Sequence, residues 1–322
     1  MSFHPCPKGL RSLPRTPLFG GATPIDRLPR FEKAIGSPYP IFIKRDDAIP
    51  FGFGGNKVRK LELVMAQALN EGATAVITCG GVQSNHCRAT AAAATRLGLS
   101  CHLVLSGAPP ASLTGNTRLG DLFGATLHFV PGRLDRAPRM LELEVLLRAG
   151  GEKPFAIPLG ASTPTGAAGL ALAVFEMLDQ GHRPGVIIHS SSSGGTQAGL
   201  VAGAAMADLK ARVIGVSADE SAATLQSMVL ELGRGVLDLA GSPARIDDAE
   251  VRDEFVGEGY GIPTDASREA QSLLARTEAI VVDHTYTAKA LAGLIDMVRK
   301  PTLHPGSSLL FWHTGGQVGI FA

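Results

Sequence analysis

The sequence of 322 residues lacks the features that mark several large classes of protein. Its formal net charge is only +1 and no run of Lys or Arg occurs, so the charges give no support for binding nucleic acid or an anionic membrane. No apolar run approaches the length of a membrane-spanning helix, and the Pro-rich amino terminus has no stretch that resembles a signal peptide. These absences predict a protein of the reducing cytoplasm.

Cysteine is also scarce, and its four positions show no CxxC spacing: Cys6, Cys79, Cys87 and Cys101. No His cluster completes a ligand set, so no metal site is predicted. Cys79 and Cys101 lie in apolar, strand-like runs, which indicates small core residues. Hydrophobic residues make up 45% and charged residues 18%, an ordinary composition for a well-packed α/β protein. The length favours two lobes, because single hydrophobic cores stop growing near this size.

From residue 73 onward, short β-rich runs alternate with Ala- and Leu-rich helical runs. Strands are predicted at 73–79, 101–105, 125–130, 154–158, 185–189, 213–217, 279–283 and 308–313. Helices are predicted at 85–97, 114–123, 134–149, 166–179, 195–208, 267–277 and 287–299. This alternation is typical of an α/β fold with two open, twisted parallel-sheet lobes, joined near residues 160–166. The stretch 237–265 is assigned no element.

A lysine on a glycine turn is the first candidate for chemistry. Residues 41–69 predict a strand, a turn at Gly54-Gly55-Asn56 and a helix that begins near Lys57. The helix end and the charges of Arg59 and Lys60 should lower the pKa of this lysine. A neutral amine is what imine formation with an aldehyde requires. On this motif alone, however, an ordinary surface lysine is the simpler interpretation.

A run of small residues follows another apolar strand and precedes a helix. Four serines, 190–193, lead into Gly194-Gly195-Thr196. Small residues let backbone N–H groups approach an anion, hydroxyls add donors, and a helix start favours negative charge, so the run predicts a phosphate site. It lacks the Lys of a Walker loop and the order of a dinucleotide GxGxxG motif. A simple packing turn is the alternative, but buried serine hydroxyls would then need partners.

The stretch 80–86 is a third turn between a strand and a helix. Ser84 stands where a helix cap is expected, and capping is its simplest role. Its functional role would be to bind a substrate carboxylate or to relay a proton at the substrate Cα. His86 is interpreted as structural, because no nucleophile stands near it in the sequence.

Two of the three tyrosines, Tyr260 and Tyr286, lie in polar turns. A tyrosine at the edge of a site commonly uses both its ring and its hydroxyl. The stretch 313–316, HTGG, follows the last apolar strand and is expected to close a cofactor pocket. Ligands gather at the carboxyl ends of strands in open α/β sheets, so all of these turns are expected to converge.

Together these stretches resemble the fold type II pyridoxal 5′-phosphate (PLP) enzymes, the tryptophan synthase β-like group. The similarity is closest to the family of D-cysteine desulfhydrase and 1-aminocyclopropane-1-carboxylate (ACC) deaminase. The matching stretches are KRDD at 44–47, GGNKVRKLE at 54–62, GGVQSNHCRATAA at 80–92, SSGGTQAG at 192–199, GYGIP at 259–263, YTAKALAGLID at 286–296 and HTGG at 313–316. They stand in the family's order and cover most of the chain.

The resemblance implies a role for each matching residue. Lys57 is similar to the lysine that forms the imine with PLP, and Ser84 to the serine near the substrate carboxylate and Cα. Tyr260 and Tyr286 match the tyrosines that position the substrate or assist the leaving group. The implied cofactor contacts are Asn85 at the phenolic oxygen, Thr287 at the pyridine nitrogen, Thr314, and a phosphate loop of Ser193, Gly194, Gly195 and Thr196.

The resemblance also implies a domain division and an assembly. Residues 1–59 and 161–322 are predicted to form a large PLP-binding domain, and residues 60–160 a small α/β domain. The expected partner is a small amino-acid substrate, and the expected assembly is a homodimer.

Position 287 distinguishes activities within this family. ACC deaminases that resemble this chain have Glu there, and a carboxylate keeps the pyridine nitrogen protonated and the ring a strong electron sink. Thr287 is neutral, as in members similar to D-cysteine desulfhydrase, which favours expulsion of a good leaving group. The predicted reaction is α,β-elimination on a small amino acid, with D-cysteine giving pyruvate, hydrogen sulfide and ammonia. ACC deaminase, L-cysteate sulfo-lyase and a PLP-binding protein without efficient turnover remain alternatives.

Overall fold

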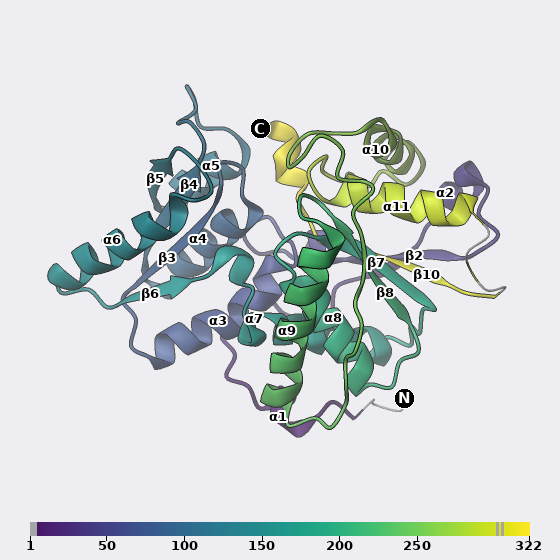
Figure 1. The fold of residues 1–322 in the computed structure, drawn as a ribbon, viewed down its shortest axis with the longest axis horizontal. Coiled ribbons are helices and arrows are strands. Elements are labelled where there is room, and N and C mark those ends of the chain that lie inside the picture. Colours follow the sequence, from purple (N-terminus) through teal and green to yellow (C-terminus); the bar gives the residue numbers. More distant parts are fainter. Residues whose placement is uncertain (1–4, 301–302, 304–305) are drawn as a thin grey trace.

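Two sheets organise the chain, which the structure, a computed structural model, describes for residues 5–300, 303 and 306–322. The larger sheet has the strand order β1 (Ile25–Arg27), β2 (Ile41–Arg45), β10 (Leu309–His313), β7 (Val186–Ser191), β8 (Arg212–Ser217) and β9 (Glu250–Arg252). The smaller sheet has the order β5 (Thr126–Val130), β4 (Ser100–Ser106), β3 (Ala75–Gly81) and β6 (Pro154–Ile157). Neighbouring strands run parallel, apart from β1, which is antiparallel to β2. The predicted α/β fold class is confirmed (Figure 1).

Helices cover both faces of each sheet. On the larger sheet, α2, α10 and α11 pack on one face and α7 and α8 on the other; on the smaller sheet, α4 and α6 lie on opposite faces. The helices and short 3-10 turns have these bounds: α1 Lys8–Arg11, α2 Pro29–Ile35, η1 Asp46–Ala48, α3 Lys57–Asn70, α4 Asn85–Leu97, α5 Gly115–Leu122, α6 Arg136–Ala149, η2 Leu159–Ala161, α7 Pro164–Asp179, α8 Gly195–Met206, α9 Ala222–Ala240, α10 Asp265–Glu278, α11 Thr287–Arg299 and η3 Gln317–Phe321.

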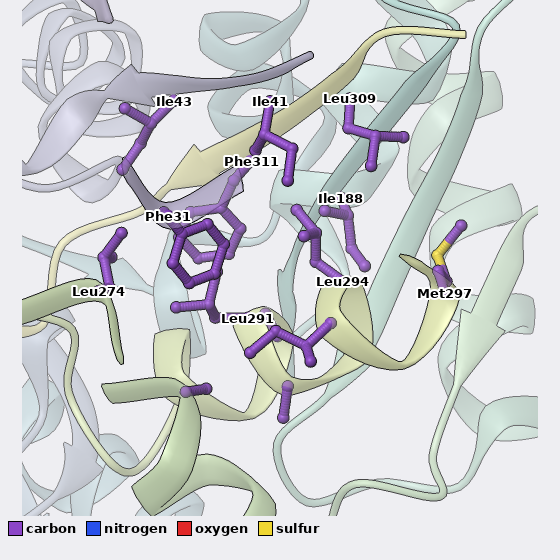
Figure 2. Packing of buried hydrophobic residues seen from close by; sticks show 14 of the residues in the cluster. Phe31, Ile41, Ile43, Ile188, Leu274, Leu291, Leu294, Met297, Leu309 and Phe311 are labelled. Atoms are coloured by element: carbon purple, nitrogen blue, oxygen red, sulfur yellow. The ribbon is translucent and has the colours of Figure 1, made fainter. Parts of the chain in front are cut away.

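The larger sheet is apolar on both faces because its strands alternate side chains between two cores. Figure 2 shows Ile41 and Phe311 pointing toward Leu291 of α11. The residues next in the chain, such as Leu310 and Trp312, face the opposite core under α7 and α8. A sheet buried in this way leaves only its strand ends open to ligands.

Most predicted elements are confirmed to within a few residues, and two helices, 85–97 and 287–299, have the predicted bounds. The strand predicted at 279–283 is wrong: these residues form no strand. Ile280 and Val282 are apolar because they pack into the α11 core, not because they pair in a sheet. The stretch 237–265, to which no element was assigned, contains the end of α9 at Ala240 and the strand β9 at Glu250–Arg252.

The smaller sheet is built wholly from the stretch 75–157, and the larger sheet from segments on both sides of it. Helix α3 packs against α4 and also against α7, so it connects the two α/β units. The predicted domain limits at 59/60 and 160/161 stay a prediction, because the first of them falls within α3.

The cysteines are free thiols, and Cys79 and Cys101 are buried in the core as predicted. Within the ranges that the structure describes, no helix is both long and apolar enough to cross a membrane.

A buried network of charges joins the larger sheet to α3. Arg59 donates to Asp46 Oδ1 at 2.8 Å and to Glu176 Oε2 at 2.8 Å. Lys44 bonds the other oxygen of Glu176 at 2.6 Å, and the indole of Trp312 donates to Asp46 Oδ2 at 2.8 Å. The network therefore ties β2, η1, α3, α7 and β10 together beneath the strand ends.

Glu176 makes this network sensitive to acid. Burial alone would raise the pKa of Glu176, but the hydrogen bonds and charge of Arg59, with Lys44, lower it from 4.5 to about 2. A lowered pKa means that the ionised carboxylate stabilises the fold fully above pH 4.5, and that this contribution is lost as the pH falls toward 2.

We therefore expect Glu176→Gln to lower the free energy of unfolding of the apoprotein by about 3 kcal/mol at pH 7. The difference from wild type should shrink between pH 5 and pH 3, as measured by urea unfolding. Glu269→Gln is the control, because the Glu269–Arg299 pair is exposed and should contribute below about 1 kcal/mol. A difference that stays constant with pH would contradict this account.

Candidate active site

One cavity, of about 390 Å³, lies where the carboxyl ends of strands from both sheets meet. This size suits a small-molecule site. Most residues singled out in the sequence line it: Lys57, Ser84, Asn85, Ser193, Gly194, Thr196, Tyr260, Tyr286 and Thr314. Two do not: Gly195 is buried directly behind the loop, and Thr287 is buried in the start of α11. The expected convergence of these turns is confirmed, although the turns of Tyr260 and Tyr286 do not directly follow a strand.

Lys57 is the first residue of α3 and is held by its turn. The N–H of Gly55 donates to the Asp46 carbonyl at 2.8 Å, and the Asn56 N–H to the Thr314 carbonyl at 3.0 Å. The Asn56 side chain donates to Thr196 Oγ1 at 2.7 Å. The turn is thus bonded to η1, to the end of β10 and to the start of α8.

The pKa of Lys57 is lowered as predicted, but the cause differs. Burial lowers it from 10.5 to about 8, although the side chain keeps some exposed surface toward the cavity. The charge of Arg59 is not the cause, because its guanidinium is paired with Asp46 and Glu176. At pH 7 a pKa of about 8 leaves roughly a tenth of the Lys57 amine neutral, far more than for a lysine with the ordinary pKa of 10.5.

Lys60 is a buried lysine that was not predicted from the sequence as a residue of the site. Its Nζ donates to the Gly160 carbonyl at 3.2 Å and to Ser162 Oγ at 3.3 Å, and it has no carboxylate partner among the described residues. Burial and then the charge of Lys57 lower its pKa well below the ordinary value. A signal was present, because residues three apart share one face of a helix and Lys60 is three residues after Lys57.

The serine and glycine loop forms an anion-sized cup above Lys60. Gly194, with φ +72°, is the N-cap of α8 and supplies no side chain to satisfy the first N–H groups of the helix. A Cβ on Gly195 would lie 2.7 Å from Ser162 Oγ and 2.8 Å from Lys60 Nζ, so a larger residue there would displace both groups.

The serine hydroxyls of the cup also favour an anionic ligand. Ser193 shares a hydrogen bond of 2.7 Å with Ser162. Ser191 Oγ is buried and has no hydrogen-bond partner in the described ranges. A free hydroxyl, a helix start without a side-chain cap and a buried lysine amine without a carboxylate partner in the described ranges are features that suit a phosphate group. These residues fit the phosphate of PLP.

Ser84 and Asn85 open helix α4 at the cavity wall. Ser84 Oγ accepts from the Cys87 N–H at 3.2 Å, so the capping role is real, and its own O–H remains able to donate. Asn116 accepts from Arg88 through Oδ1 at 2.7 Å, which fixes its amide orientation. Its Nδ2 then donates to Asn85 Oδ1 at 2.9 Å, and the Asn85 NH₂ is left to serve a ligand oxygen. This orientation fits the phenolic oxygen of PLP.

His86 was interpreted as structural, yet it lines the cavity. Thr78 Oγ1 donates to the Ile157 carbonyl at 2.8 Å, so it accepts from His86 Nε2, also at 2.8 Å. His86 therefore carries its proton on Nε2, and its buried Nδ1 has no partner within the described ranges. Burial, with the charges of Lys57 and Lys60, lowers its pKa well below 6.5, so the ring is neutral.

Tyr260 and Tyr286 both line the cavity and contact each other. Their hydroxyls share a short hydrogen bond, and their rings meet edge to face with centroids 5.6 Å apart. Burial raises the pKa of both phenols, that of Tyr286 most strongly, so both are neutral proton donors. Asp283 Oδ2 accepts from the N–H of Tyr286 at 2.9 Å and fixes the backbone on which that ring stands.

Thr287 is buried and does not line the cavity, although the resemblance implies a contact with the pyridine nitrogen. Its hydroxyl donates to Asp283 Oδ1 at 2.6 Å and accepts from the Asp283 N–H at 2.9 Å. Its contact with the pyridine nitrogen therefore stays a prediction. Thr314 does line the cavity and shares a hydrogen bond of 2.9 Å with Ser190. The sequence reading missed Asp283, because a lone acid outside any motif gives no local signal.

The cavity is also lined by four charged residues that belong to none of the motifs identified in the sequence. Arg133 and Arg136 follow β5, and Asp219 and Glu220 follow β8. The two pairs are about eighty residues apart in the chain and meet only because their sheets face one cavity.

Comparison with known proteins agrees with this geometry. The model of the pyridoxal-phosphate dependent enzyme family matches residues 17–315. The D-cysteine desulfhydrase of Salmonella typhi is 37% identical to this chain, over 97% of each. A crystal structure described as an ACC deaminase homologue has a TM-score of 0.91 and 34% identity, over 97% of this chain and 95% of its own. An L-serine ammonia-lyase from Rhizomucor miehei, with 20% identity and a TM-score of 0.67 over 94% and 95% of the two chains, shares the fold alone.

The lowered pKa of Lys57 can be measured directly. Only a neutral amine reacts with acetic anhydride, so labelling of Lys57 in the apoprotein should follow a titration with a midpoint near 8 rather than 10.5. Peptide mass spectrometry across pH 6 to 11 measures the rate, with the exposed Lys210 followed in the same samples. Labelling of Lys57 with a midpoint above 10 would show that burial does not lower its pKa.

Proposed function

Because the chain belongs to the pyridoxal-phosphate dependent enzymes, and PLP is its cofactor, we propose that it is a lyase that carries out α,β-elimination on D-cysteine. The products are pyruvate, hydrogen sulfide and ammonia, formed with uptake of one water. The observation that carries the proposal is the placement of Lys57 in one cavity with an anion cup and a pair of neutral tyrosines. The similarity to D-cysteine desulfhydrase over nearly the whole chain supports the choice of substrate.

The residues that would hold the cofactor follow from the geometry. Lys57 would bond the aldehyde carbon, and the Asn85 amide would donate to the phenolic oxygen. The start of α8, the Ser191 hydroxyl and Lys60 would bind the phosphate. When bound, PLP supplies an electron sink for the charge left at the substrate Cα.

The start of α4 would hold the substrate. Its first N–H groups and the Ser84 hydroxyl are donors for the α-carboxylate, and the helix dipole favours a negative charge there. Lys57, with a pKa of about 8, is neutral often enough to take the Cα proton on its Nζ. These residues fix the substrate and move its first proton.

The tyrosine pair would complete the elimination. A departing thiolate must gain a proton to leave as hydrogen sulfide, and a neutral phenol in hydrogen-bond reach can supply it. Tyr286 can be reprotonated through the hydroxyl of Tyr260, which shares its hydrogen bond.

ACC deaminase chemistry is the second candidate, because a structure described as an ACC deaminase homologue is similar to this chain. Thr287 argues against it, since a neutral hydroxyl stands where a carboxylate is expected for ring opening. We also infer a homodimer and a cytoplasmic location, which rest on the family resemblance and on the composition.

A substrate panel tests the proposed function. Purified enzyme should release sulfide and pyruvate in equal amounts from D-cysteine, and faster than 2-oxobutyrate from ACC or sulfite from L-cysteate. Lys57→Ala should lower kcat/KM by about 10³-fold or more, because the covalent bond and the base are both lost. Lys210→Ala, an exposed lysine, is the control. Normal turnover by Lys57→Ala, or ACC as the best substrate, would refute the proposal.

The role of the tyrosines has a separate test. Tyr286→Phe should lower kcat for D-cysteine by about 10²-fold with little change in KM, because the leaving group loses its proton donor. β-Chloro-D-alanine should be spared, since chloride leaves without a proton. Tyr39→Phe is the matched control, because the Tyr39 hydroxyl bonds only the Leu303 carbonyl in the described ranges. An equal loss with both substrates would assign Tyr286 to substrate positioning instead.

A further inference from the structure

Lys289 is a wholly buried lysine that none of the roles above explains. It is the third residue of α11, within the stretch YTAKALAGLID. Its Nζ donates to the carbonyls of Val256 and Gly259, both at 2.8 Å, and to the Ala218 carbonyl at 3.4 Å. We call these three oxygens the carbonyl cage. Among the described residues Lys289 forms no ion pair, so main-chain oxygens alone hold its charge there.

The carbonyl cage specifies the protonated form of this amine. An ammonium group has three N–H donors and a neutral amine has two, and three carbonyls surround Nζ. Burial lowers the pKa of Lys289, and the charges of Asp219 and Asp283 oppose that shift. A buried ammonium is costly unless its donors are bonded, so the carbonyl cage explains how the charge is tolerated. Main-chain carbonyls around a cation are also how potassium channels bind free K⁺.

The same contacts connect the parts of the chain that carry the two cavity tyrosines. Gly259 directly precedes Tyr260, whereas Lys289 lies three residues after Tyr286 at the start of α11. The third oxygen belongs to Ala218, which follows the last residue of β8. One side chain therefore joins the loop of Tyr260 to the helix that begins beside Tyr286, and both to the end of β8.

The loop 253–261, between β9 and α10, has no regular secondary structure to fix it. Gly257 and Gly259 have φ angles of +66° and +140°, conformations that are accessible mainly to glycine. Tyr260 and Tyr286 nevertheless share a short hydrogen bond with their rings edge to face. That contact requires the two backbones to be fixed relative to each other, and Lys289 supplies the connection.

We propose that the Lys289 ammonium is a built-in monovalent cation that positions Tyr260 against Tyr286, and that emptying the carbonyl cage creates a binding site for free K⁺. The importance of the tyrosine pair rests on the proposed function, in which it delivers a proton to the leaving group. Lys289 does not line the cavity, so it acts through Tyr260 and is a positioning residue. Without the ammonium, three carbonyls lose their donor, and either the loop moves or another cation binds.

Amide hydrogen exchange of the holoenzyme tests the positioning role without turnover. Lys289→Ala should speed exchange in peptides covering 253–262 by about tenfold or more and leave those of β7 unchanged, because only the loop loses its connection. KCl should restore most of the protection in Lys289→Ala, whereas choline chloride at the same ionic strength should not. Wild type should respond to neither salt, because its carbonyl cage is already filled.

Turnover of D-cysteine gives a second measurement. Lys289→Ala should lower kcat by about 10- to 100-fold with little change in KM, since a misplacement of about 1 Å is enough for such a loss. KCl should recover kcat by about tenfold in this variant, and choline chloride should not. The loss should be smaller with β-chloro-D-alanine, whose leaving group needs no proton.

Two matched variants make the test specific. Lys289→Met keeps an apolar stem but provides neither donors nor room for a cation, so it should show the faster loop exchange without rescue by KCl. Lys300→Ala is the control: Lys300 is the exposed C-cap of the same helix, pairs with Asp296 at 2.8 Å, and should affect neither exchange nor kcat. If Lys289→Ala loses its cofactor absorbance, KCl present during purification should restore it.

The outcomes separate this inference from the proposed function. Unchanged loop exchange in both Lys289 variants, or a failure of KCl to rescue Lys289→Ala selectively, would overturn the inference. Loss of the folded holoenzyme in both variants, with or without KCl, would also overturn it, because Lys289 would then serve the whole fold and not one loop. Absence of sulfide release from D-cysteine would overturn the proposed function, yet hydrogen exchange would still decide the role of the carbonyl cage.

Discussion

The buried guanidinium of Arg59 is the contact on which the position of the reactive lysine depends. It is only two residues after Lys57, and it is bonded at once to Asp46 beyond β2 and to Glu176 on α7. Taking one of these charges away would leave the others buried without a partner, which a fold tolerates poorly. Helix α3 is therefore fixed against the larger sheet while its first residue faces the cavity.

In the cavity, by contrast, several basic side chains have no carboxylate partner in the described ranges. Lys57, Lys60 and Arg136 lie in or beside it without carboxylate partners in the described part of the chain, and burial lowers the pKa of both lysines. Such cations are unfavourable in the protein alone and become favourable when anions bind. Paired charges stabilise the framework around Arg59, whereas the cavity combines these unpaired basic groups with one set of paired charges, Arg133 with Asp219 and Glu220.

The alternation of strands and helices could be predicted because the two periods differ and the turns between them are rich in glycine and serine. The strand prediction failed where a run of apolar residues packs into the core without pairing in a sheet. Residues 279–283 are apolar because they pack under α11, and no local pattern distinguishes that from a strand. Family, cofactor and fold class were predicted from the sequence and are confirmed.

The sequence by itself determined which residues stand in the turns: a lysine on a glycine turn, a serine and glycine loop, a serine at a helix start, and two tyrosines in polar turns. Each depends on local backbone geometry, which neighbouring residues dictate. Only the tertiary structure decided which charges stay unpaired, that Thr287 bonds Asp283, and that Arg136 shares a cavity with Lys57. Those features depend on distances between residues remote in the chain, and on the burial that removes water from between them.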